Sequence, residues 1–407
     1  MKKVALVGNM NNNFFSITRY LRDRGYEAQL FFRNIHIHFE PKSDTLKLDY
    51  LNYCHSIDEW SVNGFYHADK NKIRNTITSF DFVISQGDMA AYLNKAGVKV
   101  NLYFPYGSDI YKYAYLSPTF SIRDQILSFF RRGEKKLTYK QMKQGTIHKY
   151  LKEAIRTADF IFAEKTNEDF EKKLFGLNLE GVYKPVPMPF VYLKEYLEAT
   201  NSGNFDVHWK SVVDEIRKKN KLIVLYHGRQ EWKTYWNDFT SKNTHYLIYG
   251  FAAFVKRNTG LDAHLVMVEY GSDTQASKEL IKKLDIEKYV TWMPKMFRKD
   301  LFYLISKVDI CTGEFGRSYL TFGTIVEAMS MGKPVIHHRE DELYFGVYPD
   351  LYPLLNAKMP EEIEQQLQNY VNDPEKYQKM GKEAQAWINK YFIDEAVNKI
   401  CELIEEY

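Results

Sequence analysis

The sequence predicts an α/β protein with two domains, each built around a parallel β-sheet. Short apolar runs of strand length alternate with helical segments along most of the 407 residues, and this order is typical of sheets covered by helices on both faces. The alternation occurs in two series, separated by a rigid connector that contains Pro185, Pro187 and Pro189. The chain is also long enough to bury two hydrophobic cores.

The first series opens with a β-α-β unit. Val4–Val7 is predicted to be a buried strand, and Phe14–Arg24 a helix that ends before Gly25. Glu27–Phe32 is predicted to be the next strand, because apolar residues predominate and no proline interrupts it. Three further strands are predicted at Phe80–Ser85, Val98–Phe104 and Asp159–Ala163.

The second series repeats this pattern after a polar stretch. Its predicted strands are Leu222–Tyr226, Ala263–Glu269, Val290–Met293, Val308–Cys311 and Val335–His337, and a helical tail follows from about Pro360. The two series therefore predict two Rossmann-like domains facing a cleft. In such sheets ligands bind outside the carboxyl ends of the strands, where the loops gather.

Composition narrows the class of protein. Hydrophobic residues make up 45% and charged residues 27%, and the formal net charge is only +4, which does not favour a nucleic-acid partner. No apolar run is long enough for a transmembrane helix, and the apolar start of the chain is too short for a secretory signal. Three scattered cysteines and two histidine pairs have no metal-ligand spacing, so no metal and no cofactor are expected. The default location is the cytoplasm.

The most informative segment runs from Phe322 to Ile336, FGTIVEAMSMGKPVI. It predicts a short helix that begins at Gly323 and Thr324 and ends at Gly332. The free N–H groups at such an N-terminus suit a diphosphate, and Glu327, one turn in, suits sugar hydroxyls. The alternative is a capping box, Thr324-x-x-Glu327, which needs no ligand.

Other residues of the second half favour the same kind of ligand. Arg229 follows a predicted strand and Lys242 precedes a predicted helix, so both can neutralise a diphosphate at the strand ends. Taken alone, each is more typical of an ordinary surface charge. Gly271 ends another strand and suits a tight loop, and the backbone around Met293 and Pro294 could contact a base.

These motifs, in this order, resemble the carboxyl half of a GT-B glycosyltransferase, and more narrowly the retaining family 4 type. The likeness covers about Leu222 to His337 and is weaker before it, where Tyr106-Gly-Ser-Asp109 resembles a His-Gly-Ser-Asp segment of that family. It implies that Glu327 binds the nucleotide ribose, that Arg229 and Lys242 hold the diphosphate, and that Met293 and Pro294 lie beside the base.

Two positions depart from the family pattern. The residue eight places before Glu327 is Tyr319, where the family has a glutamate that contacts the transferred sugar. Glu314 could substitute from the preceding loop, although its spacing differs. In the first half, Tyr106 replaces the histidine, while Ser108 and Asp109 remain as polar groups. Asp109 could simply cap the turn that follows it.

The acceptor is expected on the first domain. The loop Gly8–Asn13 is rich in asparagine, and Asn11, Asn12 and Asn13 suit hydroxyl or phosphate recognition, although asparagine is also an ordinary turn residue. The basic, aromatic segment Phe120–Lys152 suits an anionic membrane surface or a lipid diphosphate. The alternative for that segment is a solvated helical face.

The sequence thus leads to one principal hypothesis and two alternatives. Residues 1–195, with a helix at 391–407 packing back, are predicted to be the acceptor domain, and 196–390 the domain that binds a UDP- or GDP-type sugar donor. The expected enzyme is a retaining, metal-independent glycosyltransferase of bacterial surface-glycan assembly. It would act on a glycan or lipid-linked acceptor, in the cytoplasm or at the inner face of the membrane. The alternatives are a nucleotide-sugar epimerase of similar shape and a binding protein whose active site has decayed.

Overall fold

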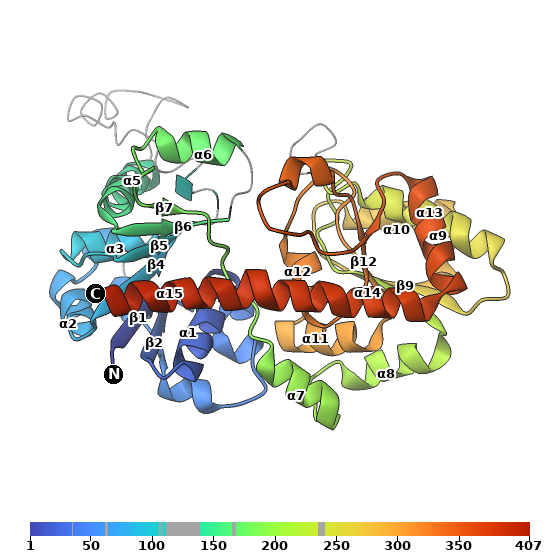
Figure 1. The fold of residues 1–407 in the computed structure, drawn as a ribbon, viewed down its shortest axis with the longest axis horizontal. Helices are drawn as coiled ribbons and strands as arrows, with labels where there is room; N and C mark the ends of the chain where they lie inside the picture. The colour runs from blue at the N-terminus through green and yellow to red at the C-terminus, as the bar shows by residue number, and fades with distance from the viewer. Residues whose placement is uncertain are drawn as a thin grey trace. The chain divides into compact units, whose positions relative to one another are not determined.

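The computed structural model describes residues 1–34, 36–61, 64–105, 107, 109–110, 139–164, 168–234 and 241–407. These residues form two compact units (Figure 1). Unit 1 comprises Met1–Ser43, Lys47–Tyr192 and Ile393–Tyr407, and unit 2 comprises Asp44–Leu46 and Leu193–Phe392. The predicted boundaries at 195 and 391 lie within three residues of the observed ones, but the sequence did not indicate that Asp44–Leu46 belong to unit 2.

Unit 1 contains a seven-stranded sheet with the order β3-β2-β1-β4-β5-β6-β7, and its strands pair in parallel. The strands are β1 (Lys3–Val7), β2 (Glu27–Phe32), β3 (Cys54–Ser56), β4 (Phe82–Gln86), β5 (Leu102–Phe104), β6 (Phe160–Phe162) and β7 (Tyr183–Lys184). The order reverses between β1 and β4, which is where ligands of open parallel sheets bind.

Helices cover both faces of this sheet because its strands alternate between two cores. On β1, Val4 and Leu6 pack into one hydrophobic cluster, while Ala5 and Val7 pack into the other. The first cluster includes residues of α1 and α15, and the second includes residues of α2, α3 and α5 (Figure 1). The helices are α1 (Asn13–Asp23), α2 (Lys70–Ile77), α3 (Met89–Lys95), α5 (Tyr139–Thr157), α6 (Glu168–Phe175) and α15 (Glu395–Glu406).

Unit 2 contains a six-stranded parallel sheet with the order β10-β9-β8-β11-β12-β13. Its strands are β8 (Leu222–Tyr226), β9 (Ala263–Val268), β10 (Val290–Met293), β11 (Ile310–Thr312), β12 (Val335–His337) and β13 (Leu355–Asn356). Its helices are α7 (Lys194–Ser202), α8 (Lys210–Lys219), α9 (Thr244–Arg257), α10 (Thr274–Lys283), α11 (Arg298–Lys307), α12 (Gly323–Ser330), α13 (Pro360–Asn372) and α14 (Pro374–Trp387). The strand order again reverses, here between β8 and β11.

The predicted strands are confirmed, with shifts at some ends. The largest shift is at β5, which begins at Leu102 and not at Val98. Asn101 explains this start: its backbone N–H donates to Val83 O, and its side-chain Oδ1 accepts from Val83 N at 2.8 Å. The side-chain amide therefore replaces one rung of the backbone ladder just before the strand.

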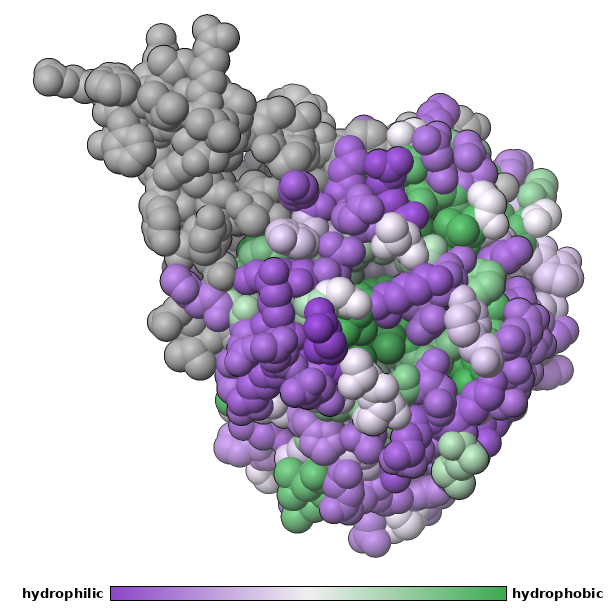
Figure 2. Space-filling view, turned by 90° about the vertical axis from the view of Figure 1, so that its left-hand side faces the viewer, coloured by the Kyte–Doolittle hydropathy of each residue, from purple (hydrophilic) through white to green (hydrophobic). Residues whose placement is uncertain are grey.

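One face of the molecule, on the side of unit 1, is mainly hydrophilic, and apolar residues lie among the polar ones near its centre (Figure 2). Within the described ranges, no helix combines the length and the apolar character needed to cross a bilayer.

Candidate functional site

The loop after β8 is held in place by one tyrosine. The hydroxyl of Tyr226, at the carboxyl end of the strand, donates to Arg229 O at 2.9 Å and accepts from the Thr244 hydroxyl at 3.0 Å. A Cβ on Gly228 would meet the Tyr226 ring at 2.9–3.0 Å, so only glycine lets the loop cross over this ring. The loop carrying Arg229 is thereby fixed to the start of α9, where Lys242 lies just before the helix.

The loop after β9 turns tightly at Gly271, as the sequence predicts, and it packs on the β8 loop. Gly271 has a φ of +113°, and a Cβ there would lie 2.5 Å from the backbone nitrogen of Gln230. Asp273 stabilises this contact between the two loops. Its carboxylate accepts from the backbone N–H groups of Trp232, Lys233 and Thr234 at 2.7–3.3 Å. Burial alone would raise the pKa of Asp273, but these hydrogen bonds lower it overall.

Lys242 pairs with Glu314, the residue that the sequence offered as a substitute for the missing glutamate. The Lys242 ammonium lies 2.8 Å from both oxygens of the Glu314 carboxylate. Their loops are joined by the backbone as well, because Phe315 N donates to Lys242 O. Burial raises the pKa of Glu314 above its ordinary value, in spite of the lysine. Tyr319 also faces this pair, with its ring centroid 6.0 Å from the lysine nitrogen.

The N-terminus of α12 packs against Gly313, the residue before Glu314, and has no side-chain cap. Its N-cap is Phe322, and its first residue, Gly323, has open space at its Cβ position. The hydroxyl of Thr324 is buried and has no hydrogen-bond partner among the described residues. The capping box Thr324-x-x-Glu327 is therefore wrong, because neither side chain bonds to the helix end. The free N–H groups and this hydroxyl leave the terminus able to bind an anion.

Glu327 bonds inward, to two cationic or proton-donating groups. One carboxylate oxygen lies 3.1 Å from His227 Nε2, and the other lies 3.2 Å from Arg298 Nε. Burial would raise the pKa of Glu327, but the hydrogen bond from His227 and the charge of Arg298 outweigh it and lower the pKa. Glu327 is therefore ionised at neutral pH. Neither His227 nor Arg298 was predicted as a site residue, although His227 directly follows the predicted strand.

The loops after two strands of unit 2, β8 and β11, converge on α12. A Cβ on Gly313, just after β11, would touch both Ile325 and Phe322 of α12 at 2.7 Å and His337 of β12 at 2.9 Å. The loop after β8 reaches the same helix through His227 and Glu327.

Two predicted donor-site residues lie at the end of another strand, β10. Met293 is buried there, its carbonyl accepts from Glu269 N, and Pro294 follows it. Arg229 pairs with Glu231 at 3.2 Å and is half exposed.

In the asparagine-rich loop of unit 1, Gly8–Asn13, two of the asparagine side chains are hydrogen-bonded within the unit. Asn11 and Asn12 have positive φ values of 51° and 59°, and Asn12 is 1% exposed. The Asn12 amide donates to the Ser43 hydroxyl at 2.9 Å and accepts from Asn9 at 2.8 Å. Asn13 starts α1 and is also buried. Of the three, Asn11 is the exposed one.

Asp109 is a buried turn residue. Its carboxylate accepts from the Tyr103 hydroxyl at 2.7 Å and from the backbone N–H groups of Gly107 and Ile110 at 2.9 and 3.0 Å. Tyr106 and Ser108 lie outside the described residues, as does most of Phe120–Lys152. Its described part, from Tyr139 on, belongs to α5, where Leu151 is buried in the core and Lys149 is exposed.

A small hollow lies at the carboxyl edge of the first sheet, and the sequence did not predict it. It has a volume of about 50 Å³ and lies where the strand order reverses, between the ends of β1, β2 and β4. Gln86 lines it, is 2% exposed, and has no partner for either amide atom among the described residues. Arg33, paired with Asp88 at 2.6 Å, also lines it. The only sequence signal was that Gln86 directly follows the predicted strand Phe80–Ser85.

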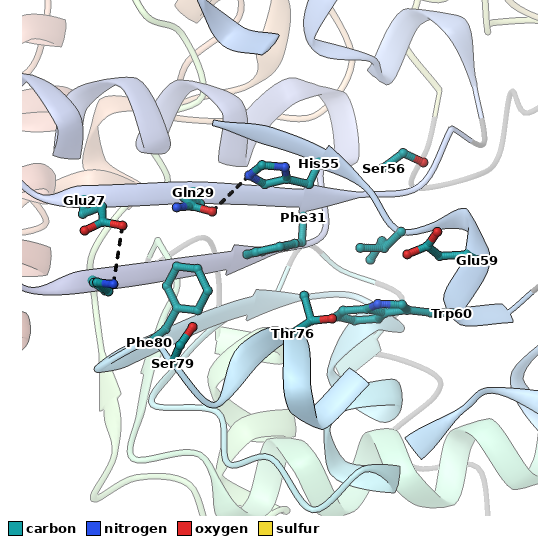
Figure 3. Close-up of a pocket in the computed structure, with 12 residues that line it drawn as sticks. Glu27, Gln29, Phe31, His55, Ser56, Glu59, Trp60, Thr76, Ser79 and Phe80 are labelled. Atoms are coloured by element: carbon teal, nitrogen blue, oxygen red, sulfur yellow. Dashed lines mark hydrogen bonds and ion pairs between the residues drawn. The ribbon is translucent and has the colours of Figure 1, made fainter. Parts of the chain in front are cut away.

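A larger hollow of about 460 Å³ lies on unit 1 and runs along β1, β2 and β3 instead of sitting at the strand ends alone (Figure 3). It is lined by Lys3 and Glu27, at the amino ends of β1 and β2, and by Phe31, which lies 5.5 Å from the ring of Phe80. The Gln29 side chain lies 3.0 Å from His55 Nε2 in the same wall. Since parallel sheets bind ligands at the carboxyl ends of their strands, this hollow is not the candidate site.

Metal ligation has no candidate in the described part of the chain, where no group of three or more His, Cys, Asp or Glu residues is placed to hold an ion. Both ring nitrogens of His337, one of the paired histidines, have hydrogen-bond partners within the protein. Its two ring nitrogens lie 3.1 Å from His338 O and 3.0 Å from the Tyr352 hydroxyl. Burial, together with the charge of Arg339, lowers its pKa to about 3.

Comparison with known proteins identifies the fold. Residues 213–387 match the family model described as glycosyl transferases group 1. Among solved structures, the chain is similar to Anabaena HepE in complex with UDP and glucose, with 15% identity, a TM-score of 0.60 and 100% of both chains covered. It is also similar to sucrose-phosphate synthase from Thermosynechococcus elongatus, with 16% identity, a TM-score of 0.59 and coverage of 100% of this chain and 99% of the other.

A third similar structure is a UDP-GlcNAc 2-epimerase from Neisseria meningitidis bound to UDP-GlcNAc, with 14% identity, a TM-score of 0.55 and 100% of both chains covered. No curated protein sequence matches the chain. The chain therefore has the GT-B fold, and its second unit carries the sequence pattern of the glycosyl transferases group 1 family.

Proposed function

We propose that this protein is a glycosyltransferase that takes a sugar from a nucleoside-diphosphate donor bound to unit 2. The observation that carries the proposal is the convergence around α12. The N-terminus of α12 has no side-chain cap and carries the buried Thr324 hydroxyl, which has no partner among the described residues. It packs against Gly313, the neighbour of the Glu314 that pairs with Lys242. Helix amides and fixed cations at one place suit a diphosphate. The match of residues 213–387 to glycosyl transferases group 1 supports the same proposal.

The donor is proposed to be a UDP-sugar in the first instance. Two of the similar structures, HepE and the epimerase, hold UDP or a UDP-sugar, and GDP remains the alternative base. In this arrangement Glu327 accepts hydrogen bonds from the ribose hydroxyls, and the strand end at Met293 and Pro294 lies beside the base. Lys242 and Arg229 stabilise the negative charge that develops on the leaving diphosphate.

The reaction is proposed to retain the anomeric configuration and to need no metal, as the family 4 resemblance implies. The bond between the anomeric carbon and the β-phosphate oxygen breaks, and an acceptor hydroxyl oxygen forms a bond to that carbon on the same face. The hydroxyl proton passes to the β-phosphate oxygen of the departing nucleotide. Because Tyr319 stands in place of the first motif glutamate, Glu314 is the carboxylate nearest in sequence to take its role.

The acceptor is proposed to bind unit 1 at the carboxyl edge of its sheet. Gln86 offers a buried donor and acceptor pair there, and Asn11 is the exposed asparagine of the neighbouring loop. A hydroxyl group can satisfy both atoms of such an amide. A glycan or lipid-linked acceptor of bacterial surface-glycan assembly, and contact of Phe120–Lys152 with an anionic membrane, remain predictions.

A first experiment identifies the nucleotide. A thermal-shift panel of UDP, GDP, CMP and ADP should show stabilisation by one of them, and a ligand at 100 times its dissociation constant adds about 2.7 kcal/mol. Release of that nucleotide from its sugar donors is then measured with and without an acceptor pool. Acceptor-dependent release supports the transferase.

The same assay separates the alternatives. An epimerase is the alternative that the similarity to the Neisseria enzyme supports. It would convert the donor sugar without any acceptor. A binding protein would bind nucleotide with no turnover. Arg257→Ala is a matched control for Arg229→Ala, because Arg257 also pairs with one glutamate, at 3.1 Å, but lies at the far end of α9. Turnover lost equally in both variants would contradict the proposed site.

A further inference from the structure

Three residues between β2 and β3 belong to unit 2, although Ser43 and Lys47 on either side belong to unit 1. The first of them, Asp44, is 0% exposed. A buried carboxylate is unfavourable unless it is paired and hydrogen-bonded, so its partners indicate why it is there. The second and third, Thr45 and Leu46, are held by a different residue, Glu195.

The partners of Asp44 form a chain that ends at Glu327. The Tyr196 hydroxyl donates to Asp44 Oδ1 at 2.6 Å, and Arg298 Nη1 lies 3.0 Å from Asp44 Oδ2. The same guanidinium donates through Nε to Glu327 at 3.2 Å. Tyr196 is itself fixed, because its ring stacks on Phe302 with centroids 4.4 Å apart.

Arg298 is thus shared between two carboxylates. Burial lowers the pKa of its guanidinium, but the charges of Asp44 and Glu327 raise it overall, so Arg298 stays charged. Asp44 takes an Nη donor of the guanidinium fork, and Glu327 receives the Nε donor. The geometry of the fork is rigid, so the position of Asp44 sets the angle at which Arg298 meets Glu327.

We propose that Asp44 is a positioning residue for the nucleotide site: it holds Arg298 so that Glu327 keeps free acceptor positions for the ribose hydroxyls. This inference rests on the proposed function. An ionised carboxylate has about four lone-pair positions, and Arg298 and His227 each occupy one, on different oxygens. Without Asp44, Arg298 turns a second donor to Glu327 and occupies a position that the ribose needs.

A purely structural role for Asp44 predicts a loss of stability without a loss of nucleotide affinity. In that case Asp44 would only tie the 44–46 segment to unit 2, as Thr45 already does through two contacts of 2.9 Å to Glu195. Loss of either residue would then lower the melting temperature and leave nucleotide affinity unchanged. Thr45→Val, which removes one hydroxyl at nearly constant volume, is therefore the matched control.

The test uses the full-length protein and the nucleotide that binds best among UDP, GDP, CMP and ADP, with affinity measured by calorimetry. Asp44→Asn should weaken that affinity about tenfold or more. It should raise the KM for the sugar donor in parallel and leave kcat within about threefold, because the ribose contact is far from the breaking bond. Thr45→Val should lower the melting temperature and leave the affinity unchanged.

A double-mutant cycle decides the outcome. If Asp44 acts through Glu327, Asp44→Asn should have no further effect on affinity in a Glu327→Gln background. Equal effects in both backgrounds, or no effect in either, would overturn the inference. Tyr196→Phe removes only the hydroxyl that donates to Asp44 and should cause a smaller loss of nucleotide affinity. It replaces Asp44→Asn in the test if that variant does not fold. Binding of none of the four nucleotides by the unaltered protein would instead overturn the proposed function together with this inference.

Discussion

Lys242→Ala should damage the protein in two separable ways. The Lys242 and Glu314 side chains are only 15% and 12% exposed, and the ammonium lies 2.8 Å from both carboxylate oxygens. Removing one partner of a buried pair leaves an uncompensated charge and typically costs about 3–5 kcal/mol. Because burial already raises the pKa of Glu314, this carboxyl can take up a proton, so we expect a loss near the lower end, about 3 kcal/mol. Turnover should fall about 10²-fold or more, as when a preorganised charge stabiliser is lost.

A double variant separates the two effects. Lys242→Met combined with Glu314→Gln removes both charges at similar volume, and it should restore stability to within about 1 kcal/mol. Turnover should stay low, because the diphosphate has still lost its cation. Melting is followed by circular dichroism, and turnover by nucleotide release.

The pH dependence of the single variant gives an independent check. A glutamate with a raised folded pKa destabilises the protein only where the unfolded chain is ionised. The stability deficit of Lys242→Ala should therefore be absent below about pH 4.3 and grow as the pH rises above it. If the double variant regains turnover along with stability, Lys242 supports the fold and does not stabilise the leaving group.

Three further predictions follow from other parts of the structure. Arg229→Ala should reduce turnover about 10²-fold, and its effect should be far from additive with Lys242→Ala, since both act on one leaving group; additive losses in the double variant would assign them separate roles. Gln86→Leu should raise stability by about 1 kcal/mol, because it removes a buried unpaired amide, while weakening transfer to acceptor and sparing nucleotide affinity; a lower melting temperature would mean that the amide has a partner. Because the pKa of His337 is lowered to about 3, the unfolded chain binds a proton below about pH 6.5 that the folded chain does not, so stability should fall with decreasing pH by at most about 1.4 kcal/mol per unit. His337→Phe should flatten that slope, and an unchanged slope would remove His337 as its source.

Local sequence was enough for the longer strands and for the short helix at 323, although it did not predict β3, β7 and β13. Runs such as Leu222–Tyr226 and Val335–His337 are apolar throughout, since a parallel sheet buries both faces of its central strands. Gly271 was predicted to sit in a tight loop, and its φ of +113° confirms a conformation that other residues rarely adopt. The family resemblance, read from the order of the motifs, gave the GT-B fold.

Local sequence failed where the decisive partner is distant in the chain. Thr324-x-x-Glu327 fits a capping box by spacing, yet Glu327 bonds to His227, 100 residues away, and to Arg298. For Asn12 the sequence left ligand recognition and a turn role open, and in the structure its amide donates to Ser43. Spacing identifies which side chains can meet within one helix or loop, and it says nothing about a competing partner that the fold brings in.

The sequence by itself therefore determined two α/β units and the placement of an acidic residue, Glu327, behind a free helix N-terminus. Only the tertiary structure decided how that carboxylate is held. The contact between Asp44 and Arg298 spans 254 residues, and no local pattern marks Asp44 as part of unit 2. Its burial and its ion pair arise because the chain between β2 and β3 passes through unit 2, and the energy of a charge in that position depends on which groups surround it there.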